Sequence, residues 1–186
     1  MEAYRLNWDL GSETLADTNR KSTPSTLEDF VAELYESQRE DVFRYLRSRG
    51  VLAADAREIC QESFFRLFLA LRRGEKIKNS RAWIFTVAHN QGVNRVLASA
   101  GQVEQEPDIQ LIAPHLDPEQ RLIENERLKR LRTAVGSLPA QQKSFLSLRA
   151  AGFRYREIAD ITGVTISTVG ESLRRAVTRL RKALYE

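Results

Sequence analysis

Residues 154–169 of the chain read RYREIADITGVTISTV, which is the pattern of a helix, a tight turn and a second helix. Ala159 is small enough for two helices to cross closely, Gly163 permits the turn, and Val169 is the first apolar anchor of the second helix. That second helix continues with apolar residues on one side and arginines on the other. Because such a helix fits the major groove of DNA, the stretch predicts a DNA-binding helix-turn-helix.

Composition restricts the class of protein. The chain has 186 residues, of which 42% are hydrophobic and 29% charged, enough for one domain or two small ones. It has no apolar run of the roughly 18 residues that cross a bilayer and no secretory pattern at its N-terminus, so we expect a cytoplasmic protein without direct membrane insertion. Its only cysteine, Cys60, argues against a disulfide framework and against a cysteine-based zinc site.

Charge is distributed in blocks, although the formal net charge is only +4. Residues 72–95 are mostly basic, residues 101–126 are mostly acidic, and the C-terminal tail is basic again. This arrangement fits two polyanion-binding modules joined by a connector, and it fits three solvated surfaces equally well.

Apolar residues recur at helical spacing through most of the chain, and no segment keeps the two-residue alternation of a strand. We therefore predict an all-α fold with two small helical domains joined by a flexible acidic linker. Residues 1–24 are expected to form a flexible leader, 25–100 the first domain, 101–118 the linker, and 119–186 a second domain that contains the helix-turn-helix.

Capping residues predict where several helices begin. Ser25 and Glu28 have the spacing of a capping box at the start of the first helix. Asp55 marks the start of a second helix, Ser80 can cap a third, and Pro139 starts a later one.

Three further motifs occur in a fixed order. They are AREICQESF at 56–64, RAWIFTVAHN at 81–90, and LPAQQK at 138–143, which leads into GFRYREIA at 152–159. On these motifs, residues 27–183 resemble bacterial sigma factors of the sigma-70 family, and within it the extracytoplasmic-function (ECF) group. The resemblance implies a protein that binds core RNA polymerase, directs it to promoter DNA and helps to open the duplex. It implies no catalytic residue, no cofactor and no metal.

The first motif places three polar residues, Glu58, Gln61 and Glu62, on one face of a helix, with apolar residues such as Ile59 and Phe64 opposite. By itself this pattern is typical of an ordinary solvated helix face. The resemblance implies instead that the polar face binds the beta-prime clamp of the polymerase through charge-assisted hydrogen bonds, with the beta subunit as a further contact.

Strand separation needs a pocket for an unstacked base and a cationic path for the exposed strand. By resemblance, the basic loop before the tryptophan motif grips a flipped base of the minus-10 element. The candidate residues are Lys76, Lys78, Asn79, Arg81, Asn90 and Arg95, with the two arginines assigned to phosphates. Trp83 has an alternative role as a core anchor. His89 is interpreted as a neutral or phosphate-contacting side chain, since no second ligand or catalytic motif accompanies it.

By resemblance, the second helix of the helix-turn-helix reads the minus-35 element. Candidates for base contacts are Ser167, Thr168, Glu171, Ser172 and Arg175, and candidates for phosphate contacts are Arg154, Arg174 and Arg179.

The chain departs from many of these relatives at Gly170, Glu171 and Ser172, where they carry Lys-Ser-Arg. Glu171 either accepts a hydrogen bond from a cytosine amino group or is turned aside by the phosphates. Gly170 inside a helix costs up to about 1 kcal/mol relative to alanine, unless the backbone must approach something closely there.

Two other classes of function are alternatives to a sigma factor. A stand-alone helix-turn-helix regulator with a helical sensor domain would share the C-terminal domain but would need neither the polar helix face nor the basic loop. An enzyme would have to use Cys60, His89 and nearby carboxylates, and no motif brings these together. We therefore expect a protein that is not an enzyme and has no small-molecule substrate. The resemblance implies an anti-sigma factor as its regulatory partner.

Overall fold

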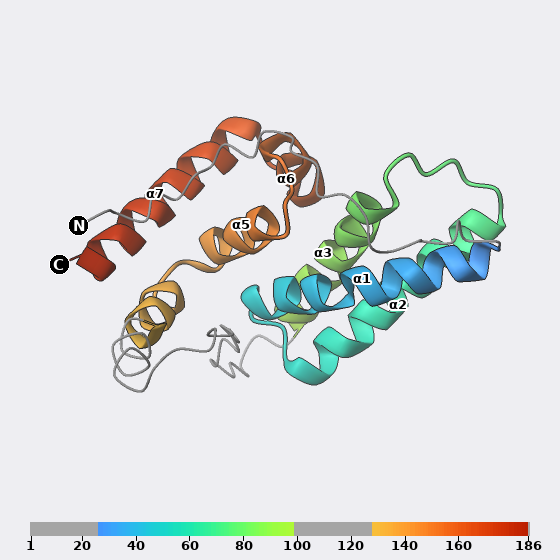
Figure 1. The fold of residues 1–186 in the computed structure, drawn as a ribbon, viewed down its shortest axis with the longest axis horizontal. Coiled ribbons are helices and arrows are strands. Elements are labelled where there is room, and N and C mark those ends of the chain that lie inside the picture. The colour runs from blue at the N-terminus through green and yellow to red at the C-terminus, as the bar shows by residue number, and fades with distance from the viewer. Residues whose placement is uncertain (1–25, 99–127, 186) are drawn as a thin grey trace, which may run out of the picture.

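The computed structural model describes residues 26–98 and 128–185, and within these ranges there are helices and no strand (Figure 1). The helical segments are α1 (Leu27–Ser48), α2 (Ala53–Arg72), α3 (Ser80–Ala98), residues 128–136, α5 (Ala140–Ala150), α6 (Tyr155–Thr162) and α7 (Ile166–Tyr185). The predicted all-α class is confirmed. The predicted leader, 1–24, and the predicted linker, 101–118, lie outside the described residues.

The first helix begins close to its predicted position but with a different cap. The side chain of Thr26 accepts a hydrogen bond from the backbone N–H of Asp29 at 3.1 Å, so Thr26 caps α1, one residue after the predicted Ser25. Helix α5 follows Pro139, as predicted.

The starts of α2 and α3 also differ from the expectation. Helix α2 begins at Ala53, so Asp55 lies in its first turn, where a carboxylate is favoured by the helix dipole, rather than at its cap. At α3 the side-chain oxygen of Asn79 accepts from the backbone N–H of Ala82 at 2.9 Å. Asn79 therefore performs the capping role predicted for Ser80.

Helices α1, α2 and α3 pack on one another around an apolar core. Its largest fully buried side chains in this part of the chain are Val42, Tyr45, Leu46, Val51, Leu67, Ile84 and Phe85. An edge-on contact between Tyr35 and Phe64, with ring centroids 5.1 Å apart, joins α1 to α2. A Cβ atom at Gly92 would lie 2.9 Å from a methyl group of Leu46, so glycine allows α3 to approach α1 closely.

The predicted helix-turn-helix is confirmed in α6 and α7. Gly163, which follows α6, has φ 70°, a left-handed conformation that glycine adopts without strain, and its N–H donates to the carbonyl of Ala159 at 2.9 Å. Thr165 then accepts a hydrogen bond from the N–H of Thr168 at 3.2 Å and caps α7. Val169 is fully buried, as an anchor of the second helix should be.

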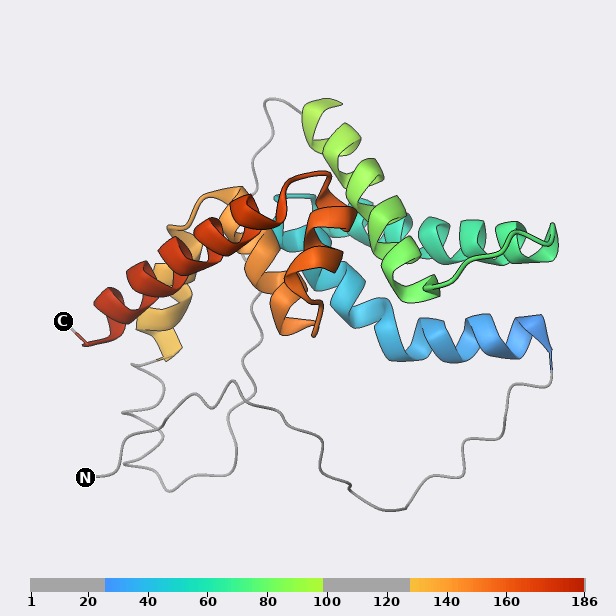
Figure 2. The same ribbon diagram turned by 90° about the horizontal axis from the view of Figure 1, so that it is seen from above.

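The N-terminal and C-terminal helices form one continuous buried core. Helix α5 packs against α1 and α6 packs against α3, so both lie between α7 and the α1–α3 bundle (Figures 1 and 2). The rings of Phe85 and Phe153 meet edge to face across this contact, with centroids 4.8 Å apart. Within the described residues, no helix has the length and apolarity that a bilayer crossing requires.

Candidate protein and nucleic-acid interfaces

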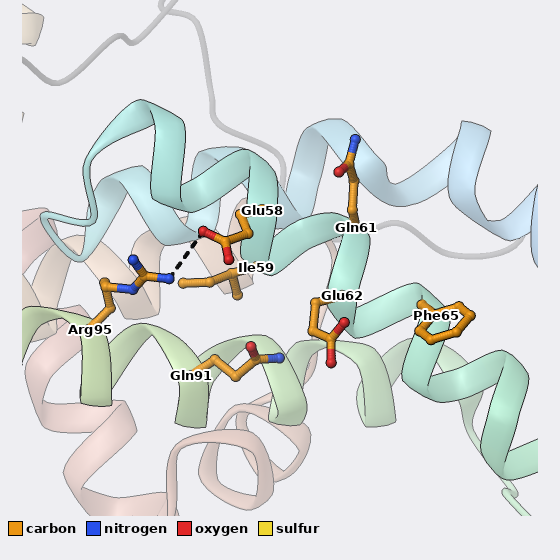
Figure 3. Close-up of a pocket in the computed structure, with 7 residues that line it drawn as sticks. All are labelled: Glu58, Ile59, Gln61, Glu62, Phe65, Gln91 and Arg95. Atoms are coloured by element: carbon orange, nitrogen blue, oxygen red, sulfur yellow. Dashed lines mark hydrogen bonds and ion pairs between the residues drawn. The ribbon is translucent and has the colours of Figure 1, made fainter.

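A polar face on α2, formed by Glu58, Gln61 and Glu62, is open to solvent, and we call it the docking face. Glu58 and Gln61 are exposed and Glu62 is half-buried. The three line a cleft of about 340 Å³ between α2 and α3 (Figure 3). The remaining lining residues are Ile59, Phe65, Gln91 and Arg95.

Both carboxylates of the docking face have a neighbouring cation. Arg95 binds Glu58 at 3.1 Å and Asp55 at 2.8 Å, and Arg66 binds Glu62 at 2.7 Å. Ion pairs as exposed as these contribute only about 0–1 kcal/mol each, so basic groups of a partner can replace them at little cost. Arg95 was predicted to hold a promoter phosphate, and the structure places it in this cleft beside the docking face.

Two residues of the cleft, Phe65 and Gln91, were not predicted from the sequence. Phe65 lines the cleft and has 55% of its surface exposed, so an apolar ring is accessible there. The side-chain nitrogen of Gln91 is buried without a hydrogen-bond partner among the described residues. Counting from Glu62, Phe65 follows at i+3, so helical spacing alone could have placed it beside the polar face.

The candidates for minus-10 binding fall into two groups. Lys76, Lys78 and Asn90 are exposed on the loop before α3 and on α3 itself. Asn79 is exposed but engaged: besides capping α3, its amide nitrogen donates to a carboxylate oxygen of Glu157 at 3.4 Å.

Arg81 is held by several groups and is only about one-third exposed. Its Nε donates to the side-chain oxygen of Gln38, and Nη2 donates to the carbonyl of Ala151. The guanidinium carbon lies 4.3 Å from the ring centroid of Phe153, and Asp41 is 3.8 Å from Nη2. In this arrangement Arg81 donates hydrogen bonds to groups of the protein itself, and only about one-third of its side chain is open to a phosphate.

The histidine in the tryptophan motif is structural. His89 is buried, and its Nδ1 lies 2.6 Å from the hydroxyl of Tyr45. Burial, and then the positive charge of Arg49, lower the pKa of His89 to about 4, so the ring is neutral at pH 7. Its burial leaves no room for a phosphate contact. Trp83 packs on the core while remaining half-buried.

Among the described residues, neither the buried nucleophilic side chains nor any cluster of metal-ligating side chains points to a catalytic site. Burial raises the pKa of the Cys60 thiol to about 11 and that of Tyr45 to about 12, so both stay protonated. Across residues 26–98 and 128–185, no group of three or more His, Cys, Asp or Glu side chains could hold a metal ion.

The outer face of α7 carries most of the minus-35 candidates, and Arg154 lies just before α6. The exposed ones are Arg154, Ser167, Glu171, Arg174, Arg175 and Arg179, and Thr168 is half-buried. Ser172 does not belong to this face, because it is 8% exposed and lies next to the buried Leu173. The buried side of α7 includes Ser172 together with Val169, Leu173 and Ala176, so this candidate for a base contact lies away from the others.

Two of the exposed residues on α7 form a pair. A carboxylate oxygen of Glu171 lies 2.8 Å from Nη2 of Arg175, one helical turn further on. Both side chains are more than half exposed, so the pair projects from the outer face of the helix rather than into the protein. Thr165 adds a small hydroxyl cluster near the start of the helix, with Ser167 at 2.9 Å and Thr168 at 2.8 Å.

Replacing Gly170 with alanine should stabilise the protein by up to about 1 kcal/mol, because glycine lowers helix stability by that amount. A Cβ atom at this position would lie 3.8 Å from the ring of Tyr155, an ordinary van der Waals contact, so alanine fits. Chemical denaturation of the two chains measures the difference. A loss of stability in Gly170→Ala would show that the backbone needs glycine here.

Comparisons with known proteins agree with this arrangement. The family model for Sigma-70 region 2 matches residues 34–100, and that for Sigma-70 region 4 matches residues 128–180. RNA polymerase sigma factor YlaC of Bacillus subtilis is 28% identical over 158 residues, which cover 83% of this chain and 91% of the relative. ECF RNA polymerase sigma factor RpoE of Cereibacter sphaeroides is also 28% identical over 158 residues, covering 81% of this chain and 84% of the relative.

Two solved structures share the fold. Sigma factor RpoE in complex with the anti-sigma factor NepR, from Bartonella quintana, has a TM-score of 0.63 at 22% identity, covering 84% of this chain and 97% of that chain. CnrH in complex with the cytosolic domain of CnrY has a TM-score of 0.55 at 19% identity, covering 86% of this chain and 90% of that chain. With region 2 and region 4 matched in order along one chain, the protein belongs to the sigma-70 family of RNA polymerase sigma factors and to its ECF group.

Proposed function

We propose that this sigma factor joins core RNA polymerase through the docking face on α2 and recognises a promoter with two other surfaces. The observation that carries the proposal is the separation of two exposed surfaces: a carboxylate-rich cleft between α2 and α3, and an arginine-rich outer face on α7. A stand-alone regulator would need only the second. The protein acts by binding and needs no substrate or cofactor.

At the docking face, the chemistry is charge-assisted hydrogen bonding. Glu58 and Glu62 accept from basic side chains of the beta-prime clamp, which displace the present partners Arg95 and Arg66. Phe65 supplies an apolar contact beside them, and the unpartnered amide nitrogen of Gln91 can donate to an acceptor of the polymerase. Two carboxylates beside one exposed aromatic ring suit a basic protein partner better than a polyanion.

For the minus-35 element, we propose that the Glu171–Arg175 pair reads bases while Arg154, Arg174 and Arg179 hold phosphates. A carboxylate accepts from the amino group of cytosine, and an arginine donates to guanine. The exposure of both side chains on the outer face of α7 supports this proposal.

Changing Glu171 to Gln should therefore alter the preferred base at one position of the minus-35 element by about tenfold. Changing Arg174 to Ala should weaken binding to all sequences alike and reduce the salt dependence by about one phosphate contact. To compare the variants, holoenzyme is reconstituted with each of them, and the DNA duplexes that it binds are selected from a library. An unchanged base preference in Glu171→Gln would show that Glu171 does not contact a base.

We assign residues 25–100 to the domain that contacts polymerase and the minus-10 element, and 119–186 to the minus-35 domain. Lys76, Lys78 and Asn90 are exposed, and in this proposal they contact the separated DNA strand. An anti-sigma factor is the proposed regulatory partner, which is supported by the similarity to the Bartonella quintana RpoE solved with one.

A selection from random duplex DNA tests the proposed function. The library is incubated with core polymerase alone, with this chain alone, and with the two together. The DNA bound in each case is then sequenced. We expect two conserved sequence blocks at a fixed spacing only when both proteins are present. A sequence enriched equally by the chain alone would support the stand-alone regulator instead.

A further inference from the structure

The helix-turn-helix carries two exposed apolar side chains. Five large hydrophobic residues are exposed in the described part of the chain, and one of them, Phe65, lies in the cleft between α2 and α3. Val96 and Leu97 lie on the last turn of α3. The other two are Tyr155, the first residue of α6, and Ile166, the first residue of α7, which are 44% and 51% exposed. Single exposed apolar residues are common on protein surfaces, whereas these two belong to the element that carries the minus-35 candidates.

Gly170 connects the two residues. It follows Ile166 by one turn of α7, and a Cβ atom at Gly170 would lie 3.8 Å from the ring of Tyr155. Because glycine has no side chain, position 170 leaves this ring uncovered on the side of α7. We call Ile166, Gly170 and the ring of Tyr155 the apolar strip.

The apolar strip runs beside the polar residues that we propose for base contacts. Ser167, Glu171 and Arg175 follow one another at intervals of four residues, and all three are exposed. Ile166 and Gly170 each precede one of them by a single residue, so they lie along the edge of the same outer face. The α7 surface therefore has a polar row and, on the side of Tyr155, an apolar one.

Cations at both ends of the strip indicate the kind of partner that covers it. Arg154 directly precedes Tyr155, Arg174 follows Gly170 by one turn, and both arginines are exposed. An apolar patch of another protein would have to bury these charges, whereas the phosphates of a DNA duplex neutralise them. In the major groove, the C5 methyl group of thymine is the apolar group that distinguishes one base from the others.

The turn before α7 fixes the position of Ile166. The hydroxyl of Thr165 lies 2.9 Å from that of Ser167 and 2.8 Å from that of Thr168. It also accepts a hydrogen bond from the N–H of Thr168 at 3.2 Å. Ile166 lies between Thr165 and Ser167 in the chain, so its backbone is ordered before DNA binds and less entropy is lost on binding.

We propose that the apolar strip contacts the methyl group of a thymine in the minus-35 element and so adds an apolar preference to the polar contacts of Glu171 and Arg175. Ile166 and the ring of Tyr155 supply the contact surface. Gly170, which lowers the stability of the helix, leaves room for the methyl group between them. The proposal rests on the assignment of α7 to the minus-35 element made above.

Replacing thymine with uracil tests the proposal, because the two bases differ only by this methyl group. The minus-35 block obtained in the selection is synthesised with deoxyuridine in place of each thymine of either strand in turn, and the affinity of the wild-type holoenzyme for each duplex is measured. We expect one replacement to weaken binding about fourfold, as for the loss of one buried methyl group. Equal affinity for all of the duplexes would overturn the proposal.

Variants of the strip locate the contact. Holoenzyme with Ile166→Ala should bind the thymine and uracil duplexes equally well, and Ile166→Val, which keeps a branched side chain, should retain most of the fourfold ratio. Leu97→Ala removes an exposed aliphatic side chain from α3 and is the matched control, which should keep the wild-type ratio. Both duplexes are measured with the same chain, so a general loss of affinity cancels in the ratio. A wild-type ratio in Ile166→Ala would overturn the proposal.

A second variant covers the possibility that Ile166→Ala does not fold. Tyr155→Ser changes the other helix of the motif and should also lower the ratio, and an unchanged ratio would overturn the strip as a contact surface.

Arg174→Ala separates a failure of this proposal from a failure of the proposed function. This variant should weaken binding to the thymine and uracil duplexes alike, because a phosphate contact is insensitive to the base. If Arg174→Ala and Glu171→Gln both leave binding unchanged, α7 does not contact the minus-35 element and the proposed function fails there. If they change binding while Ile166→Ala keeps the wild-type ratio, only the methyl contact fails.

Discussion

Replacing Glu58 and Glu62 together with lysine should lower the affinity of the chain for core polymerase by about 100-fold. In the proposed complex each carboxylate makes charge-assisted hydrogen bonds that contribute at least about 1.5 kcal/mol, so the loss of two corresponds to roughly 100-fold, and a lysine in their place adds repulsion toward a basic partner. Both residues lie on the surface of α2, where their ion pairs contribute little to folding. The loss should therefore appear in binding and not in the stability of the free protein.

The matched control changes two carboxylates of the same domain. Glu36 and Glu40 on α1 are exposed and pair with Arg39 and Arg44, much as Glu58 and Glu62 pair with Arg95 and Arg66. Replacing both with lysine makes the same change in net charge away from the docking face. Titration of labelled sigma factor with core polymerase compares the two double variants. Equal losses would mean that overall charge, and not the docking face, governs the affinity.

Acid should destabilise the protein through His89. The pKa of this histidine is lowered to about 4 in the fold, whereas an exposed histidine in the unfolded chain has a pKa of about 6.5. Between these values the unfolded state binds more protons, so the contribution is fully present above pH 6.5 and is lost as the pH falls toward 4. Linkage gives a loss of about 2 kcal/mol at pH 5 from this one group.

A chain with His89 replaced by Gln isolates the effect. Glutamine keeps a polar partner for the hydroxyl of Tyr45 but cannot be protonated, and the other histidine, His115, is unchanged. The free energy of unfolding, measured from pH 7.5 to 5, should fall by about 2 kcal/mol less in His89→Gln than in the wild type. Parallel curves for the two proteins would show that His89 is protonated equally well when folded.

The sequence predicted the helices well because helical periodicity and the turn glycine are local signals. Gly163 and Val169 have the roles that their neighbours in the sequence indicated, and Pro139 precedes α5 as predicted. The capping residues of the helices were predicted less accurately than the helices themselves. Asn79 and Ser80 can both cap a helix, and the backbone geometry at the end of the loop decides between them.

The partners of single arginines could not be predicted, because they depend on contacts between distant segments. Arg81 and Ala151 are 70 positions apart, and Arg95 and Asp55 are 40 apart. A basic residue in the tryptophan motif gives no indication of which distant segment holds it. Ser172 shows a related limit, since residues at the edge of a helical stripe are buried or exposed according to what packs beside them.

Transcription itself tests the central claim most directly. Run-off transcription is measured from a template that carries the two sequence blocks obtained in the selection, using purified core polymerase with and without this chain. We predict transcripts of defined length only when the chain is present, and their loss with the Glu58 and Glu62 lysine variant but not with the Glu36 and Glu40 variant. Unchanged transcription on adding the chain, together with tight binding of the chain alone to the same duplex, would contradict the sigma-factor account.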